Sequence, residues 1–139
     1  MARSDRYTPR AVVPTHYSDP TESFDLDPVT GSLAVLTNED AIRASVLRLL
    51  LTNRYERFQS PWIGSKLRAA LGETMSTVTE TIIADSIRET IANCEPRVKV
   101  NDVRVVSDPN NNAYLVTLDV EALRVVRPFQ ISITLRRTR

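Results

Sequence analysis

The stretch Asn93-Cys94-Glu95-Pro96-Arg97-Val98 divides the chain into two patterns of apolar residues. Before it, isoleucines recur every four residues, which predicts one apolar face of a long helix over about 75–93: Ile83, Ile87 and Ile91. After it, apolar and polar residues alternate, which predicts strands. Pro96 has no backbone N–H and steers Glu95 into an extended conformation. We therefore expect a rigid corner at which the helix ends.

This corner carries opposite charges on a stiff backbone. Glu95 and Arg97 lie two residues apart, separated by a proline whose φ angle is fixed. One interpretation is a simple ion pair or exposed turn at the helix end. The alternative is a contact site for a partner, because charged groups on a rigid backbone lose little entropy on binding.

Length and composition limit what the protein can be. The chain has 139 residues, a net charge of +1, one cysteine and three glycines, which favours a single domain without a disulfide framework or a cysteine-rich metal site. The sequence has no glycine-rich phosphate loop. Because it also lacks a signal-peptide core and an apolar run of membrane-spanning length, we expect synthesis and retention in the cytosol.

Residues 1–38 form a segment with four prolines and no sustained apolar period: Pro9, Pro14, Pro20 and Pro28. We expect this segment to be extended, as either a disordered tail or an arm that orders on a neighbour. Its second part, from Phe24 on, predicts short strands joined by a turn near Gly31. The main domain is then expected over 39–139.

A first helix is predicted from Asn38, as N-cap, to about Thr52. One face is apolar, through Ile42, Val46, Leu49 and Leu50. Leu47 and Leu51 lie on another side, so this helix is either enclosed in its own fold or meets another protein.

A structured loop is predicted over 53–64, with turns at Pro61 and Gly64. We expect Phe58 and Trp62 to anchor it, and Glu56 to form an ion pair with Arg57. A short helix over 65–71 should end at Gly72 as its C-cap, and the long helix should begin near Ser76 or Thr77.

The remaining sequence predicts three antiparallel strands. The first slips in phase at Asn101-Asp102, as a β-bulge would cause, and a turn follows at 108–112. The expected inward-facing residues of the other two strands are Tyr114, Val116, Leu118, Val120 and Ala122, and then Phe129, Ile131, Ile133 and Leu135. The predicted fold is α+β, with two main helices and a short helix packed on a three-stranded antiparallel sheet, and an extended N-terminal arm.

Residues from about 24 to 135 resemble a known family. Leu50-Leu51-Thr52 followed by Glu56-Arg57-Phe58 is similar to its segment "L-T-x-x-G-E-R-x-F", with Tyr55 in place of the glycine. Pro61-Trp62-Ile63-Gly64 is similar to its turn "P-x-F-G", and Glu95-Pro96-Arg97 is similar to its signature tripeptide. The family is that of the small, sheath-proximal baseplate wedge proteins of contractile-tailed phages, which also occur in type VI secretion and other contractile injection systems.

The resemblance implies a structural subunit of a virion tail baseplate, assembled in the host cytoplasm. In such proteins the corner, here Glu95, Pro96 and Arg97, contacts a helical core bundle of larger wedge subunits. To this contact we add Leu47 and Leu51, from the surplus apolar surface of the first helix. The sheet edge implies a sheath contact by strand exchange, assigned to Phe129, Ile131, Ile133, Arg136 and Arg137 together with the arm. The tail tube or hub is a further candidate neighbour.

Other function classes find less support. Parts of the family carry a lysozyme label, but Glu56, Glu73 and Glu95 form no recognisable catalytic pair, and His16 is the single histidine. We therefore expect no catalytic residues, metal site or cofactor. Several arginines gather near the C-terminus, but without a nucleic-acid-binding motif: Arg124, Arg127, Arg136, Arg137 and Arg139. Binding to nucleic acid or membrane is not expected.

Overall fold

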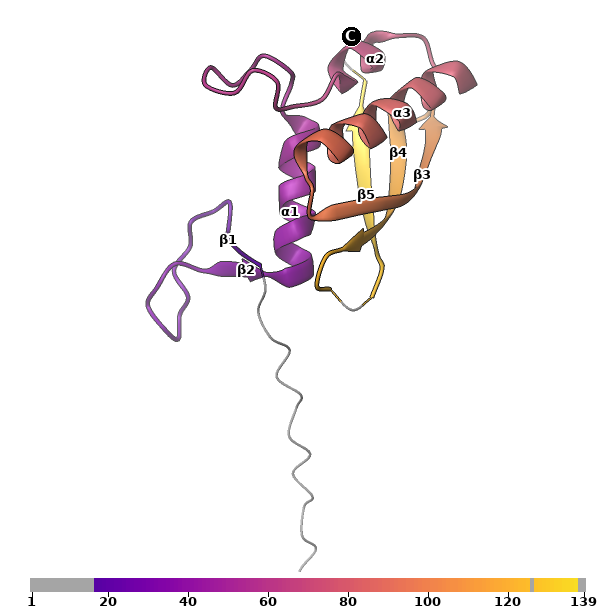
Figure 1. Cartoon of the computed structure of the whole chain (residues 1–139). Coiled ribbons are helices and arrows are strands. Elements are labelled where there is room, and N and C mark those ends of the chain that lie inside the picture. The colour runs from indigo at the N-terminus through magenta and orange to yellow at the C-terminus, as the bar shows by residue number, and fades with distance from the viewer. Residues whose placement is uncertain (1–16, 126, 138–139) are drawn as a thin grey trace, which may run out of the picture.

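The computed structural model describes residues 17–125 and 127–137. Three helices, α1 (Asn38–Leu51), α2 (Leu67–Gly72) and α3 (Thr77–Cys94), accompany a sheet of β3 (Val98–Asp108), β4 (Ala113–Ala122) and β5 (Phe129–Arg136) (Figure 1). Two short strands, β1 (Ser18–Pro20) and β2 (Val35–Thr37), precede them. The predicted α+β fold is confirmed.

The long helix α3 begins with a side-chain cap. Ser76 Oγ accepts a hydrogen bond from the Thr79 backbone N–H at 3.2 Å, which satisfies one of the free donors of the first turn. The isoleucines predicted to share one face are fully buried: Ile83, Ile87 and Ile91. They pack against the sheet, mainly against β3.

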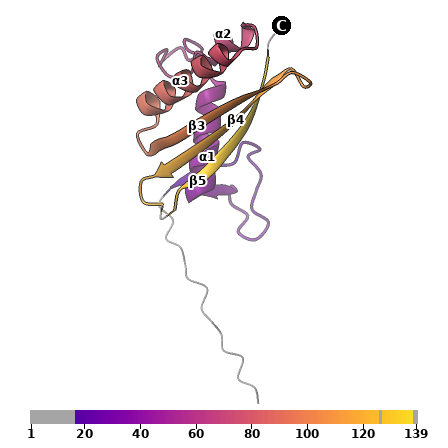
Figure 2. The same cartoon turned by 90° about the vertical axis from the view of Figure 1, so that its right-hand side faces the viewer.

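The sheet has the strand order β3-β4-β5 and is antiparallel throughout. The register of β3 and β4 shifts between Val100 and Asp102, so the predicted bulge is confirmed. The inward-facing residues of β4 are all buried, as predicted. Figure 2 shows the strands in front of α1 and α3 alongside β3, and no described helix covers the face of the sheet that points toward the viewer.

Helix boundaries differ from prediction at three places. The N-cap of α1 is Thr37, while Asn38 adopts a φ of 48° and its Oδ1 accepts a hydrogen bond from the Tyr17 N–H. Helix α2 begins at Leu67, because Ser65 is held in the loop by its N–H bond to the Thr52 carbonyl. Gly72 is the last helical residue of α2, not its C-cap.

The N-terminal arm contains a hairpin. β1 pairs with β2 in register Ser18↔Thr37, and Leu26 bridges Leu33 nearer the tip. The strand-like pieces predicted after Phe24 are therefore present, whereas strand β1 was not predicted. Residues 1–16 of the predicted arm, including His16, lie outside the described residues. Among the helices that are described, none has the length and apolarity to span a bilayer.

Candidate functional site: the corner between α3 and β3

The chain turns from helix to strand within three residues. The Glu95 N–H donates to the Ile91 carbonyl at 2.9 Å, which closes the last helical turn. The Val98 N–H donates back to the Glu95 carbonyl at 3.1 Å, so the turn is closed on both sides of Pro96. Pro96 is exposed, and β3 starts at Val98. The predicted end of the helix at this corner, and the start of a strand after it, are confirmed.

Glu95 and Arg97 form a bidentate ion pair. Arg97 Nε donates to Glu95 Oε1 at 2.6 Å, and Arg97 Nη2 donates to Oε2 at 2.8 Å. Ser45 Oγ, on α1, donates to the same Oε2 at 2.7 Å. Glu95 is only 5% exposed, so these charge-assisted hydrogen bonds satisfy a nearly buried carboxylate. Of the two simple interpretations, the helix-end ion pair is present and the exposed turn is wrong for Glu95.

The electrostatics of the pair keep Glu95 ionised. Burial alone would raise the pKa of the Glu95 carboxyl, but hydrogen bonds from Arg97 and Ser45 and the charge of Arg97 outweigh it, so the pKa lies below its usual value. The hydrogen bond to Glu95 likewise raises the pKa of Arg97. A carboxyl acting as a general acid needs the opposite shift.

Two members of this cluster were missed from the sequence. Ser45 lies three residues after Ile42, on the buried side of α1. A polar hydroxyl on an otherwise apolar helix face is the sequence signal that could have identified it. Tyr17 places its ring 5.4 Å from Arg97 Cζ. Nothing in the local sequence of the arm indicates that contact, because it joins residues far apart in the chain.

Leu47 and Leu51 differ in their availability to a partner. Leu51 is 69% exposed at the end of α1. Leu47 is half-buried and packs against the core. Most of the apolar surface of α1 is therefore enclosed within the fold, and Leu51 is the part that remains on the surface.

The loop over 53–64 is ordered at its base and not by its aromatic residues. Phe58 is fully exposed and Trp62 is 63% exposed, so the prediction that they anchor the loop is wrong. Glu56 Oε2 accepts a hydrogen bond from the Asn53 N–H at 2.7 Å, in place of the predicted ion pair with Arg57. Gly64, with a φ of 134°, lies directly against the backbone of Thr52 and Asn53.

These elements match a known family. The family model of the baseplate wedge protein gp25 matches residues 37–139, which include α1, the loop, the corner and the whole sheet. This chain belongs to the baseplate wedge protein gp25 family. No curated protein matches the sequence significantly.

Several solved structures have a similar fold. A candidate tail lysozyme from Geobacter sulfurreducens has a TM-score of 0.68 at 21% identity, covering 76% of this chain and 97% of that one. A chain of the anti-feeding prophage baseplate has a TM-score of 0.60 at 20% identity, covering 88% and 86%. A chain of the postcontracted pyocin R2 baseplate has a TM-score of 0.51 at 20% identity, covering 82% and 98%.

The residues predicted for a sheath contact of this wedge protein divide between core and surface. Ile131 and Ile133 are buried, and Phe129 is half-buried against the core, so these side chains belong to the domain's own interior. Arg136 is exposed. Arg137 is half-buried, and its Nη1 donates to Asn112 Oδ1 at 3.3 Å.

The arginines that are clustered in the C-terminal sequence are separated in space. Arg124 and Arg127 lie in the connection before β5, and Arg136 lies at its far end, about 20 Å or more away along an extended strand. Arg139 lies outside the described residues. In the part that is described, these residues do not build one basic surface, and no group of three potential metal-ligating side chains occurs there.

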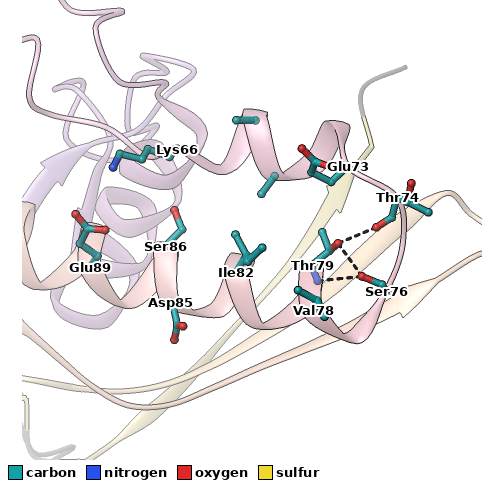
Figure 3. Close-up of a pocket in the computed structure, with 12 residues that line it drawn as sticks. Lys66, Glu73, Thr74, Ser76, Val78, Thr79, Ile82, Asp85, Ser86 and Glu89 are labelled. Atoms are coloured by element: carbon teal, nitrogen blue, oxygen red, sulfur yellow. Dashed lines mark hydrogen bonds between the residues drawn. The ribbon is translucent and has the colours of Figure 1, made fainter.

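A groove of about 690 Å³ lies between α2 and α3 (Figure 3). It is rimmed by Glu73, Asp85 and Glu89, all of them exposed, with Ile82 between the helices. Asp85 forms an ion pair with Arg88 at 3.1 Å. None of the three carboxylates lies in the apolar, buried setting that would keep a general acid protonated.

Proposed function

We propose that this protein is a structural baseplate subunit of a contractile phage tail. It docks on a helical core bundle of the larger wedge subunits through the Glu95-Pro96-Arg97 corner, and it offers β5 as a template for the first ring of the tail sheath. The observation that carries the proposal is the family match over 37–139, which includes both surfaces. Assembly in the host cytoplasm and a place in the virion tail baseplate go with this role.

The corner has the properties of a preorganised contact. Pro96 is exposed and conformationally fixed, and about one third of the Arg97 side chain is exposed. The pair with Glu95 uses Nε and Nη2, which leaves Nη1 as the group to donate to an acceptor on the bundle. In this arrangement Glu95 does not touch the partner but orients the residue that does. Leu51 would add apolar contact area from the end of α1.

The edge of β5 supports the sheath contact. β5 pairs with β4 on one side, and no other described strand pairs with its second side. A strand edge of this kind can accept another chain by backbone hydrogen bonding. Because the side chains of Ile131 and Ile133 are in the core, the contact would use the backbone of β5 and the exposed Arg136.

Docking is tested by incorporation into particles. The full-length chain carrying Arg97→Lys keeps its positive charge but loses the planar guanidinium, and we expect its incorporation with the larger wedge subunits to fall about tenfold or more. The matched control is Arg57→Lys in the exposed loop, which should assemble normally. Normal incorporation of a folded Arg97→Lys protein would refute docking through the corner.

The sheath contact is tested by charge reversal at Arg136 and Arg137. Arg136→Glu, alone and combined with Arg137→Glu, should block sheath polymerisation while baseplates still form. Lys99→Glu, an exposed charge on β3, is the control. Simultaneous loss of sheath and baseplate would argue against the division of the surface into two contacts.

A baseplate subunit of a type VI secretion or other contractile injection system is the alternative particle. The likeness in fold to the anti-feeding prophage and pyocin R2 baseplate chains supports it. Electron microscopy of particles containing the tagged protein would separate these alternatives, because a phage tail is attached to a capsid.

Peptidoglycan hydrolysis is a weaker alternative, raised by the name of the Geobacter sulfurreducens structure. The lowered pKa of Glu95 and the exposure of Glu56 and Glu73 argue against it. We expect the purified full chain to release no muropeptides from peptidoglycan, and release that is lost in Glu73→Gln would overturn the structural role.

A further inference from the structure

We propose that Tyr17, which precedes the family-matched residues 37–139, is a positioning residue for the corner and holds Arg97 in its docking orientation. This inference rests on the proposed docking function. It concerns the residue directly before β1, the strand that pairs with β2 beside the start of α1 (Figure 1).

Tyr17 is fixed by contacts with two separate elements. Its hydroxyl donates to the Leu123 carbonyl just after β4, and its backbone carbonyl accepts from the Asn38 N–H at 2.9 Å at the start of α1. The Leu123 N–H in turn donates to the Arg97 carbonyl at 2.9 Å. The ring is therefore held in place independently of the guanidinium that it faces.

The guanidinium of Arg97 is restrained from two directions. Glu95 holds its Nε and Nη2 edge, and the Tyr17 ring lies 5.4 Å from Cζ, within the range of a cation–π contact. Ser45 Oγ on α1 adds to the edge contact, because it accepts from Arg97 Nη2 at 3.1 Å and donates to Glu95 Oε2 at 2.7 Å. Glu95 and Ser45 both contact the edge of the guanidinium, and the Tyr17 ring is the group that faces its plane. Tyr17 therefore supplies the restraint that the corner tripeptide lacks.

The same contact joins the arm to the corner. Arg48 on α1 donates to the Pro20 carbonyl at 3.3 Å and pairs with Glu22 at 3.1 Å, so the hairpin that begins at Ser18 is held on the domain next to Tyr17. A partner that displaces the hairpin would also release the ring from Arg97. The arm therefore has to be in place for the corner to keep its docking geometry.

Two substitutions of Tyr17 separate its ring from its hydroxyl. Tyr17→Phe keeps the ring, and Tyr17→Leu removes the ring while keeping an apolar side chain. Tyr55→Leu, which removes an exposed aromatic of the loop, is the control. The full-length variants are compared by the NMR signal of Arg97 Nε–Hε and by affinity for the co-purified larger wedge subunits of the same particle.

We expect Tyr17→Leu to shift and broaden the Arg97 Nε–Hε signal and to weaken docking by about two- to fivefold. Tyr17→Phe should dock within about twofold of the unsubstituted chain. A larger loss of affinity is expected if Tyr17 acts only through its hydroxyl bond to the Leu123 carbonyl. An unchanged Arg97 signal in Tyr17→Leu, or equal docking losses in both variants, would overturn the inference. A changed signal with unchanged docking would support the positioning of Arg97 and refute docking through the corner.

Discussion

The corner and the loop over 53–64 use the same residue types with different results. Each contains a glutamate, an arginine and a proline, and each has an aromatic residue available. At the corner, Glu95 and Arg97 form a bidentate pair beneath the ring of Tyr17. In the loop, Glu56 bonds the backbone of Asn53, and Phe58 is fully exposed.

The difference lies in what surrounds the charges. The corner lies between a long helix and a strand, so Glu95 is carried into a nearly buried position where only a close cation and a hydroxyl can replace water. The loop has regular structure only at its base, and its carboxylate remains exposed, where an ion pair contributes little. Burial therefore distinguishes these two glutamates, although exposed charges close in sequence also pair, as Asp85 and Arg88 do.

The largest effect is expected where the loop is attached. At Gly64, an added Cβ would lie 2.8 Å from backbone atoms of Thr52 and Asn53, at a φ of 134° that other residues rarely adopt. We expect Gly64→Ala to lower the free energy of unfolding by about 2–3 kcal/mol, measured by urea denaturation.

Gly72→Ala is the matched control, because nothing lies within 4 Å of the added Cβ at the end of α2. It should be neutral or stabilise by about 0.5 kcal/mol. If Gly64→Ala were also neutral, the base of the loop would not be rigid. The loop would then differ from the corner in its backbone as well as in its side chains.

Removing the cation tests the corner itself. Arg97→Met leaves the Glu95 carboxylate nearly buried, with Ser45 and the backbone N–H of residue 97 as its partners. We expect a loss of about 2 kcal/mol in the free energy of unfolding, less than for a fully buried pair because Arg97 is about one third exposed.

Arg57→Met, in the exposed loop, should change the same free energy by less than about 0.5 kcal/mol. Equal effects of the two substitutions in urea denaturation would remove the distinction between the two regions.

The same contrast explains what the sequence could predict. Periodicity identified α3, the bulge after Val100 and the inward face of β4, because each depends on local spacing of apolar residues. It also located the corner, because Pro96 acts locally. It did not find Ser45 or Tyr17, which reach the corner across 50 and 80 residues of chain.

The errors in the loop and on β5 have a common physical cause. Aromatic type indicated an anchor at Phe58 and Trp62, but both side chains are exposed, because residue type does not report burial. On β5, one set of residues was assigned both to the inward face and to a partner contact. Ile131 and Ile133 cannot serve both with their side chains.

Acid should weaken the corner through Glu95. Its pKa is lowered in the folded state, so the stabilisation is present above the ordinary value of about 4.5 and is lost as the pH falls through the lowered pKa. We expect the free energy of unfolding to fall below about pH 4.5. The effect should be smaller than that of Arg97→Met, because a protonated Glu95 is no longer a buried charge.

Two variants test whether Glu95 is the source of the lost stability in acid. Glu95→Gln should reduce the acid slope but not abolish it, since backbone hydrogen bonds to Asp27 and side-chain hydrogen bonding from Asn111 to Asp108 also lower the pKa of those carboxyls. Ser45→Ala removes one hydrogen-bond donor to the Glu95 carboxylate, so the loss of stability should begin at a higher pH. An acid slope that is identical in all three proteins would assign the effect to other groups.

The smallest effect is expected at the tip of the loop. Phe58→Ser replaces a fully exposed side chain, so the free energy of unfolding should change by less than about 0.5 kcal/mol. A loss of 2 kcal/mol or more in urea denaturation would show that Phe58 packs on the protein in solution, as the sequence first suggested. A neutral result leaves an aromatic side chain that contributes nothing to the fold, in a loop whose base is held rigidly by Gly64. That combination would keep the loop tip distinct from the corner, because Phe58 would be an exposed group that the fold does not need, whereas Arg97 holds the nearly buried Glu95 carboxylate.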